Sequence, residues 1–374
     1  MDSHGRDHTL RVWRLTVKDE EILDKTLPVD IQGSSGDRNA PWLIHSLTVN
    51  ALNFCAFAHC FIPGEDPQEP GRSTPLQPSN GGSNFVPPSQ MLLAVPNALN
   101  TGGVDIMHLP SERRISVISP DPSINTGMVM ALSIFFSSQG DLYVASGYED
   151  GRAMVHLRRG PIKGQDLVNQ GGDQECCNWK RVYMNKQHSQ PVLSLDVCPM
   201  TRAYFLTSSA DALIVKHPIP EPSQKTSQRG SASEIEQLPM KVVNKKHAGQ
   251  QGLKMRSDAK IFATAGWDSR NRVYSYKTMK EMAVLKWHKE GCYAIALADV
   301  NVSLHSVATT KASPDTSRGE QNPTEEEAES GILAVAEQPR SLQAIKLQRS
   351  QKAQLMHWIA AGSKDGKISL WDIY

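Results

Sequence analysis

The sequence predicts an all-β protein built from repeated β-hairpins, and three observations favour this fold class. Glycine and proline contribute 26 and 23 of the 374 residues, a turn-rich composition that suits many short strands. Near the end of the chain, two short apolar runs flank Asp365-Gly366. This dipeptide favours a tight hairpin turn, because glycine adopts a positive φ without steric cost. The third observation is that the same arrangement recurs upstream in a constant register.

In each copy of the hairpin, an aspartate at the turn is followed six positions later by an aromatic or histidine ring. The five copies are Asp7 with Trp13, Asp150 with His156, Asp211 with His217, Asp268 with Tyr274, and Asp365 with Trp371. A weaker sixth copy, from Gly102 to His108, lacks the turn aspartate. Five copies in one register indicate a structural repeat, and closing the last copy on Trp371-Asp372 is typical of a WD repeat. The sequence therefore predicts a WD-repeat β-propeller.

We expect the repeated side chains to be structural. An aspartate carboxylate accepts hydrogen bonds at the turn, while the ring offers a hydrogen bond to a neighbouring strand and fills the space between sheets. His188 and His288 each precede an apolar strand, where WD repeats carry a Gly-His pair. Because the aspartates share one repeat position, we do not expect two of them to converge as a catalytic pair.

Residues 1–374 are predicted to form a single, N-terminally incomplete propeller domain. Asp7 already stands at the turn of the first hairpin, so we expect about five and a half blades in a ring that is not closed. Residues 22–31 are the candidate outer strand of the first blade, and residues 43–57 contain the candidate inner strand of the next. Segments rich in Pro, Ser or Glu predict disordered insertions at about 63–90, 221–240 and 306–332.

Composition and motifs argue against several classes of function. The 40 Lys and Arg residues nearly balance the 39 Asp and Glu residues, which leaves a formal net charge of +1. This balance does not favour direct binding to nucleic acid or to an anionic membrane. The six cysteines lack C-x-x-C spacing, as expected of reduced thiols. The sequence contains no phosphate-binding loop, nucleophile elbow or zinc-protease motif, so we expect no catalytic residue, cofactor or metal.

Two segments resemble repeats of a known family. The segments His4 to Trp13 and Trp358 to Tyr374 look like the second and last repeats of the ASTRA-associated protein 1 family, fungal WD-repeat subunits of the ASTRA complex. Residues 129–151 and 264–276 add to the resemblance, which spans nearly the whole chain apart from the insertions. The resemblance implies a parent fold of seven blades, of which this chain lacks the first repeat.

The resemblance also implies a function. Members of this family are expected to be non-catalytic scaffold or adaptor subunits of the nuclear ASTRA complex. That role is linked to chromatin remodelling, to telomere regulation and to the co-chaperone-dependent maturation of phosphatidylinositol-3-kinase-related kinases. The implied partners are ASTRA subunits and the associated kinase co-chaperones, and the implied location is the nucleus, with the cytoplasm as a second location.

Two alternative functions remain open at this point. A G-protein-β-like signalling adaptor would share the propeller fold, although that class usually carries an N-terminal helical extension, which the sequence does not show. A propeller enzyme would need polar residues, outside the repeat positions, that face the central channel. The sequence reveals only residues at repeat positions, so the adaptor remains the favoured function.

Overall fold

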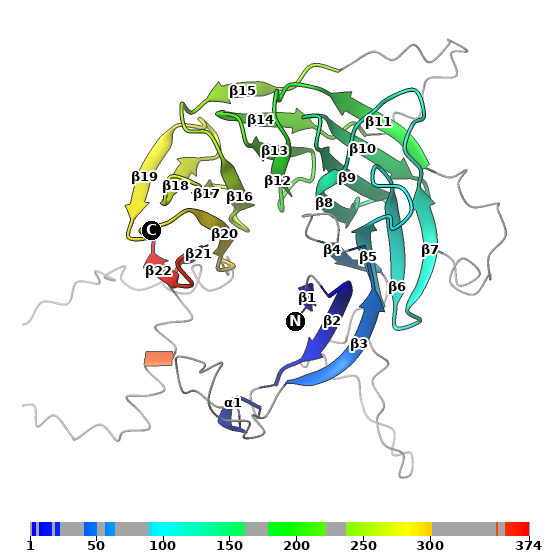
Figure 1. The fold of residues 1–374 in the computed structure, drawn as a ribbon, viewed down its shortest axis with the longest axis horizontal. Coiled ribbons are helices and arrows are strands. Elements are labelled where there is room, and N and C mark those ends of the chain that lie inside the picture. The colour runs from blue at the N-terminus through cyan, green and yellow to red at the C-terminus, as the bar shows by residue number, and fades with distance from the viewer. Residues whose placement is uncertain are drawn as a thin grey trace, which may run out of the picture.

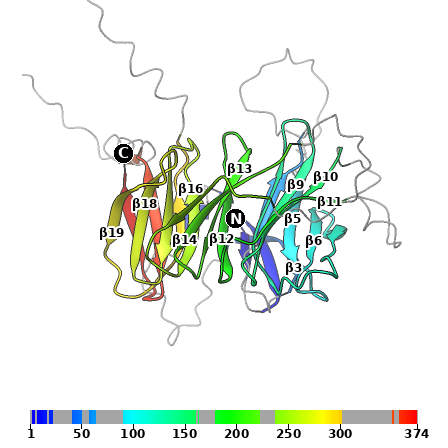
Figure 2. The same cartoon turned by 90° about the horizontal axis from the view of Figure 1, so that it is seen from above.

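The computed structural model describes residues 2–4, 7–16, 19–22, 41–50, 57–63, 90–160, 162, 179–221, 237–300, 349–350 and 356–373. These residues form 22 strands and the short helix α1 (Asp19–Ile22). The strands make six antiparallel sheets, which are arranged in a ring around a central axis (Figure 1). Figure 2 shows the same ring from the side, with the strands running across its thickness.

Each sheet takes its strands in chain order. The first sheet contains β1 (Asp2–His4), β2 (Thr9–Arg14) and β3 (Trp42–Thr48). The second contains β4 (Ala58–Phe61), β5 (Met91–Pro96), β6 (Val104–Leu109) and β7 (Arg113–Ile118). The third contains β8 (Val129–Phe136), β9 (Leu142–Tyr148), β10 (Ala153–Arg158) and β11 (Trp179–Asn185).

The remaining three sheets follow the same plan. The fourth contains β12 (Val192–Val197), β13 (Tyr204–Ser209), β14 (Leu213–Pro218) and β15 (Lys241–Asn244). The fifth contains β16 (Gln250–Met255), β17 (Ile261–Gly266), β18 (Arg270–Ser275) and β19 (Glu281–Lys286). The sixth contains β20 (Cys292–Leu297), β21 (Trp358–Ser363) and β22 (Ile368–Asp372). The first strands of successive sheets, from β4 to β20, contact one another around the centre of the ring.

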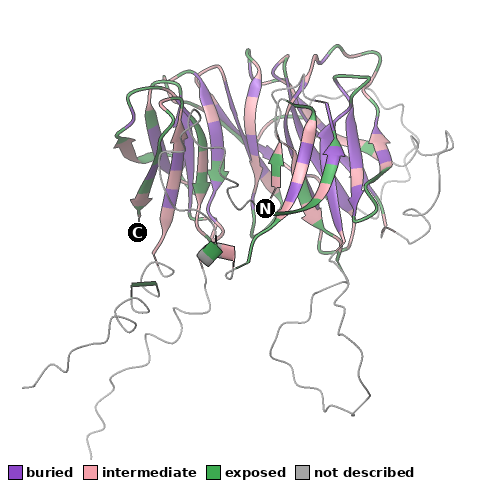
Figure 3. Cartoon of the chain, turned by 60° about the horizontal axis from the view of Figure 1, so that its bottom comes forward, coloured by how far each residue is buried: buried purple, intermediate pink, exposed green. Residues whose placement is uncertain are grey.

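Apolar side chains fill the space between neighbouring sheets. In β5, Leu92 and Leu93 are both fully buried but belong to different hydrophobic clusters. Leu92 packs with the third sheet and Leu93 with the first, because successive side chains of a strand point to opposite faces. The middle strands are therefore apolar on both sides, as expected for sheets covered on both faces. Figure 3 shows buried residues along the strands and exposed residues mainly in the loops and outer strands.

The expectation of about five and a half blades in an unclosed ring is wrong, because the described residues form six sheets in a ring. The first hairpin gains its outer strand from β3, which pairs with β2 from Thr9↔Thr48 to Arg14↔Trp42. We expected an inner strand of the second sheet within residues 43–57. Residues 51–56 of this range lie outside the described residues, and the first described strand of the second sheet is β4. Alternating hydrophobicity shows that a segment forms a strand, but it does not show which sheet the strand joins.

Several sequence predictions fall on residues that the structure does not describe. Of the candidate outer strand at 22–31, residue 22 ends α1 and residues 23–31 lie outside the described residues. The predicted insertion at 306–332 lies outside them entirely, as do residues 64–89 and 222–236 of the other two. The disorder of these three segments therefore stays a prediction.

Candidate functional site

The repeat positions of the fourth sheet meet in one buried hydrogen-bond network. His188, just before β12, places Nδ1 3.1 Å from Asp211 Oδ1 and Nε2 2.8 Å from Thr207 Oγ1. The same Thr207 oxygen lies 2.9 Å from Nε2 of His217. Both histidines are buried. The network therefore connects the segment before the sheet with β13, the turn after it and β14.

The charges of this network are fixed by burial and by hydrogen bonds. Burial raises the pKa of the Asp211 carboxyl, but hydrogen bonds from His188 and from the backbone N–H groups of Leu213 and Ser189 outweigh it and lower the pKa. Burial lowers the pKa of His217 well below 6.5, and the charge of His188 acts in the same direction. His217 is therefore a neutral ring at neutral pH, with one nitrogen that donates and one that accepts.

The sixth sheet repeats the network with a different hydroxyl. His288 Nδ1 lies 3.2 Å from Asp365 Oδ2, and its Nε2 lies 2.8 Å from Ser369 Oγ. Trp371 donates from Nε1 to the same Ser369 oxygen at 3.0 Å. Thr207 stands four residues before its turn aspartate, whereas Ala361 occupies that position in the sixth sheet. The structure thus supplies the shared hydroxyl from the strand after the turn.

In the fifth sheet, an arginine rather than a histidine binds the turn aspartate. Arg272 is 1% exposed and donates to both carboxylate oxygens of Asp268, at 3.1 and 2.5 Å. Burial raises the pKa of Asp268, but the hydrogen bonds and charge of Arg272 outweigh burial, so that the pKa of this carboxyl is lowered. The predicted ring, Tyr274, is buried and stacks on Phe262 with centroids 4.9 Å apart. This pair of rings fills the sheet interface.

The first sheet presents its repeat positions nearer to solvent. Arg11 donates to Asp7 Oδ2 at 2.6 Å and lowers the pKa of that carboxyl. Trp13 donates from Nε1 to Ser3 Oγ at 2.8 Å, across the pair β1 and β2. Both contacts are local to the first sheet.

The third sheet departs most from the pattern. Asp150 accepts hydrogen bonds from the backbone N–H of Arg152, at 3.0 Å, and from its guanidinium. Ser146 stands four residues before Asp150 but donates to the Tyr148 hydroxyl at 3.1 Å. His156 therefore has no hydrogen bond with Ser146. In the fourth sheet, by contrast, the matching Thr207 hydrogen-bonds to the ring of His217.

The predicted site residues thus lie in separate networks rather than in one catalytic centre. Asp7, Asp150, Asp211, Asp268 and Asp365 each accept hydrogen bonds from residues of their own sheet or of the segment before it. In the described part of the chain, no group of three or more His, Cys, Asp or Glu side chains could hold a metal ion. Among the same residues, no helix is long and apolar enough to cross a membrane. The repeat positions hold the sheets together.

Comparison with known proteins identifies the family. The WD domain, G-beta repeat family matches residues 355–372, which contain β21 and β22. ASTRA-associated protein 1 of Penicillium rubens is 52% identical over all of this chain and 81% of its own length, and the Aspergillus niger protein of that name is 51% identical with the same coverage. The Schizosaccharomyces pombe protein of that name is 28% identical, over 79% of this chain and 75% of its own length. The chain belongs to the ASTRA-associated protein 1 family.

Family membership confirms the resemblance that the terminal repeat predicted. Membership and the WD repeats together indicate a scaffold role, because propellers of this kind present loops and sheet edges to other proteins.

In this member of the ASTRA-associated protein 1 family, exposed aromatic side chains gather at one end of the fifth and sixth sheets. Trp267 and Trp287 are 45% and 54% exposed. A Cβ atom built at Gly291 would lie 3.1 Å from the Trp267 carbonyl, so the two loops are adjacent.

We name Trp267 and Trp287 the tryptophan patch. Trp267 lies in the turn between β17 and β18 and donates from Nε1 to Gln251 Oε1 at 3.0 Å. Trp287 precedes β20, and Lys367 Nζ lies 5.8 Å from its ring centroid. Large exposed aromatic side chains are enriched where proteins bind one another. Sequence reasoning missed this patch, because spacing along the chain does not show that two loops are neighbours.

Proposed function

We propose that this chain is a non-catalytic adaptor of the ASTRA complex. The proposal rests on its 52% identity, over the full chain, with a protein named ASTRA-associated protein 1. The geometry supports an adaptor, because the repeated carboxylates and rings bind to one another or to turns and build a rigid frame. A frame of this kind acts by presenting surfaces to partners rather than by bond chemistry.

The finer assignment concerns location and partners. We propose that the adaptor acts in the nucleus and joins ASTRA subunits to the co-chaperones that mature phosphatidylinositol-3-kinase-related kinases, with consequences for chromatin remodelling and telomere regulation. The formal net charge of +1 supports protein partners over nucleic acid, since nucleic-acid binding depends on many phosphate contacts from basic side chains. A fluorescent fusion excluded from nuclei would contradict the location.

We assign the partner contact to the tryptophan patch. Its two rings lie on adjacent loops, so that one partner surface can cover both. Tryptophans are prominent among the few residues that supply most of the binding energy at interfaces, and truncating such a residue typically costs about 2 kcal/mol or more. That loss corresponds to at least about a tenfold weaker complex.

The test is affinity purification of the tagged chain from a filamentous fungus, followed by mass spectrometry. We expect the unchanged chain to recover ASTRA subunits and kinase co-chaperones. The double variant Trp267→Ala/Trp287→Ala should recover at least about tenfold less of them, since both rings are lost. Trp42→Ala is the matched control, because Trp42 is 68% exposed on the distant strand β3.

Three outcomes separate the parts of this proposal. Failure of the unchanged chain to recover any ASTRA subunit would contradict the adaptor function itself. Equal recovery by the double variant and the unchanged chain would contradict the tryptophan patch but leave the adaptor intact. Thermal unfolding of all variants should agree within a few degrees, which excludes misfolding as the cause of lost binding.

A further inference from the structure

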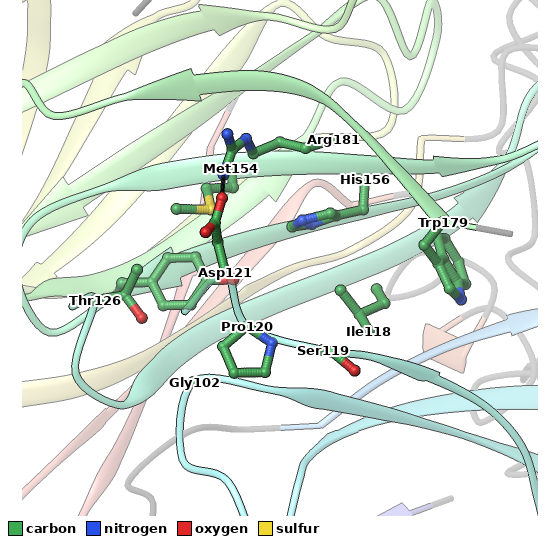
Figure 4. Close-up of a pocket in the computed structure, with 11 residues that line it drawn as sticks. Gly102, Ile118, Ser119, Pro120, Asp121, Thr126, Met154, His156, Trp179 and Arg181 are labelled. Atoms are coloured by element: carbon green, nitrogen blue, oxygen red, sulfur yellow. Dashed lines mark hydrogen bonds and ion pairs between the residues drawn. The ribbon is translucent and has the colours of Figure 1, made fainter. Parts of the chain in front are cut away.

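A cavity of about 290 Å³ lies between the second and third sheets. It opens where the segment after β7 meets β10 and β11, as Figure 4 shows. Its wall combines apolar side chains with the hydroxyl-bearing residues Ser119, Thr126 and Tyr148, one histidine and one ion pair. The lining residues include Ile118, Pro120, Asp121, Met154, His156 and Arg181.

His156 is the unusual member of this wall. It projects from β10 into the cavity (Figure 4) and is only 9% exposed. Its Nδ1 atom is buried and has no hydrogen-bond partner among the described residues. Burial lowers the pKa of His156 to about 4, and the charge of Arg181 acts in the same direction. The ring is therefore neutral at neutral pH, and Nδ1 donates or accepts a hydrogen bond according to its tautomer.

In the fourth sheet, the ring nitrogen that corresponds to His156 Nδ1 has a hydrogen-bond partner. His217 occupies in the fourth sheet the place that His156 occupies in the third, six residues after the turn aspartate. Its Nδ1 atom lies 2.9 Å from the hydroxyl of Tyr183, on the outer strand β11 of the preceding sheet. The two rings meet edge to face with centroids 5.6 Å apart. At the interface between the third and fourth sheets, the hydroxyl of a phenol therefore supplies the hydrogen-bond partner of the histidine ring.

Strand register shows which residue occupies, for His156, the position that Tyr183 occupies for His217. Tyr183 pairs with Val155 immediately before a β-bulge in the third sheet. In the second sheet, Ser116 pairs with Ile106 immediately before the corresponding bulge. Ser116 thus stands where Tyr183 stands, but its side chain is too short to supply a phenol.

Ser116 also has another hydrogen bond. Its Oγ atom accepts from Trp179 Nε1 at 2.7 Å. Since Ser146 donates to Tyr148, His156 has neither of the hydroxyl partners that bind His217. Buried polar atoms are nearly always paired, because an unpaired one has lost its hydrogen bonds to water. By the parallel with His217, the group that fits His156 Nδ1 is a hydroxyl.

Charge and size restrict that group further. Arg181 Nη1 lies 2.9 Å from Asp121 Oδ2, so the cavity holds one positive and one negative side chain. A neutral group suits this balance, since a second charge would face a like charge from Arg181 or from Asp121. A cavity of about 150 Å³ with apolar walls accepts benzene, so the present space accommodates one substituted aromatic ring against Ile118, Pro120 and Met154.

We propose that this cavity binds a phenolic ring, the hydroxyl of which hydrogen-bonds to His156 Nδ1 as Tyr183 does to His217. The ring comes either from a tyrosine side chain of a partner protein or from a free phenolic molecule. The two sources share one chemistry and are separated by the probes below. The site is distinct from the tryptophan patch and goes beyond the adaptor function.

The first experiment titrates the full chain with p-cresol and with toluene, which has the same shape without the hydroxyl. The chain carries ¹⁵N-labelled histidine, and the side-chain ¹⁵N resonances are followed by nuclear magnetic resonance. We expect p-cresol to shift the His156 resonances and to bind about tenfold more tightly than toluene, as one additional buried hydrogen bond implies. Equal affinities, or an unshifted His156 signal, would overturn the proposal.

The variant His156→Phe keeps a ring in the wall and removes the hydrogen bond. We expect it to bind p-cresol and toluene within about twofold of each other, since the polar contact is gone. A variant that still prefers p-cresol tenfold would overturn the role of His156. The comparison of two ligands on the unchanged chain decides the question independently, even where the variant folds poorly.

Two capped tripeptides, Gly-Tyr-Gly and Gly-Phe-Gly, separate the sources. Preferential binding of the tyrosine peptide, with a shift at His156, assigns the site to a partner side chain. Binding of p-cresol without either peptide assigns it to a free phenolic molecule. Binding of neither p-cresol nor the tyrosine peptide would overturn the site.

Discussion

At the scale of single residues, hydroxyl groups decide whether a repeat position is satisfied. Thr207 bonds both His188 and His217, whereas Ser369 bonds both His288 and Trp371. In the third sheet, the Nδ1 atom of His156 is buried without a partner among the described residues, because Ser116 stands where Tyr183 stands for His217. One small side chain thus distinguishes a structural histidine from a candidate binding residue.

The variant Thr207→Val tests this role. Valine keeps the shape of threonine but gives no hydrogen bond to either histidine, so buried ring nitrogens lose their partner. We expect the free energy of unfolding to fall by about 1–3 kcal/mol, measured by urea denaturation. Thr278→Val, at an exposed turn, should change it by less than about 0.5 kcal/mol. Equal losses in the two variants would show that the network adds nothing.

Part of this residue-scale pattern is readable in the sequence. The constant spacing of six residues located the aspartates and the rings, and Thr207 could also have been found as a hydroxyl four residues before Asp211. Ser369 could not, because it lies after the turn while its counterpart lies before it. Its position depends on how two antiparallel strands face each other.

At the scale of single elements, the Asp-Gly hairpins look alike in sequence but not in space. Gly151 and Gly366 follow their aspartates at φ +89° and +74°, in the left-handed region that favours glycine. A Cβ atom at Gly366 would meet nothing within 4 Å, whereas one at Gly151 would lie 2.2 Å from the His188 carbonyl oxygen. The backbone of the next loop packs directly against Gly151.

These two glycines form a matched pair for mutation. Gly366→Ala should lower the free energy of unfolding by about 1–2 kcal/mol, the cost of a left-handed conformation for alanine. Gly151→Ala should cost more than about 4 kcal/mol, because the backbone of the neighbouring loop must also move. Urea denaturation of both variants measures the difference. A difference below about 1 kcal/mol would contradict the close approach seen at Gly151.

Element prediction from the sequence succeeded for the middle of the chain and failed near its beginning. The turn aspartates with a ring six positions later marked the hairpins, such as β9 with β10, because this spacing is a local signal. The segment that forms β3 was partly assigned to the second sheet, although it completes the first. Pairing of β2 with β3 joins residues 28 to 39 positions apart, from Arg14↔Trp42 to Thr9↔Thr48, and local patterns carry no information on such a pairing.

At the scale of the whole molecule, five hydrophobic clusters of described residues join the six sheets in sequence. Leu93 lies in the cluster between the first and second sheets, and Leu206 lies in the cluster between the fourth and fifth. Each sheet thus packs on its neighbours, as in other repeat architectures, in which stability is approximately a sum of neighbour terms.

Two leucine variants test how far such neighbour terms are independent. Leu93→Ala and Leu206→Ala should each cost about 2–5 kcal/mol, since both side chains are fully buried. In native-state hydrogen exchange, Leu93→Ala should reduce amide protection in β1–β7 and spare β16–β19. Leu206→Ala should reduce protection in β12–β19 and spare β1–β3. Uniform loss over all six sheets in both variants would instead show one cooperative unit.

The sequence by itself determined the all-β class, the WD repeat, the turn aspartates with their rings, and the family, because each of these depends on local spacing or on direct similarity. Only the tertiary structure decided that six sheets form the ring, that β3 belongs to the first sheet, and that Ser369 supplies the shared hydroxyl. It alone also revealed the tryptophan patch and the buried Nδ1 atom of His156, which has no hydrogen-bond partner in the described part of the chain. These features depend on contacts between residues far apart in the chain, and such contacts exist only once the sheets have packed.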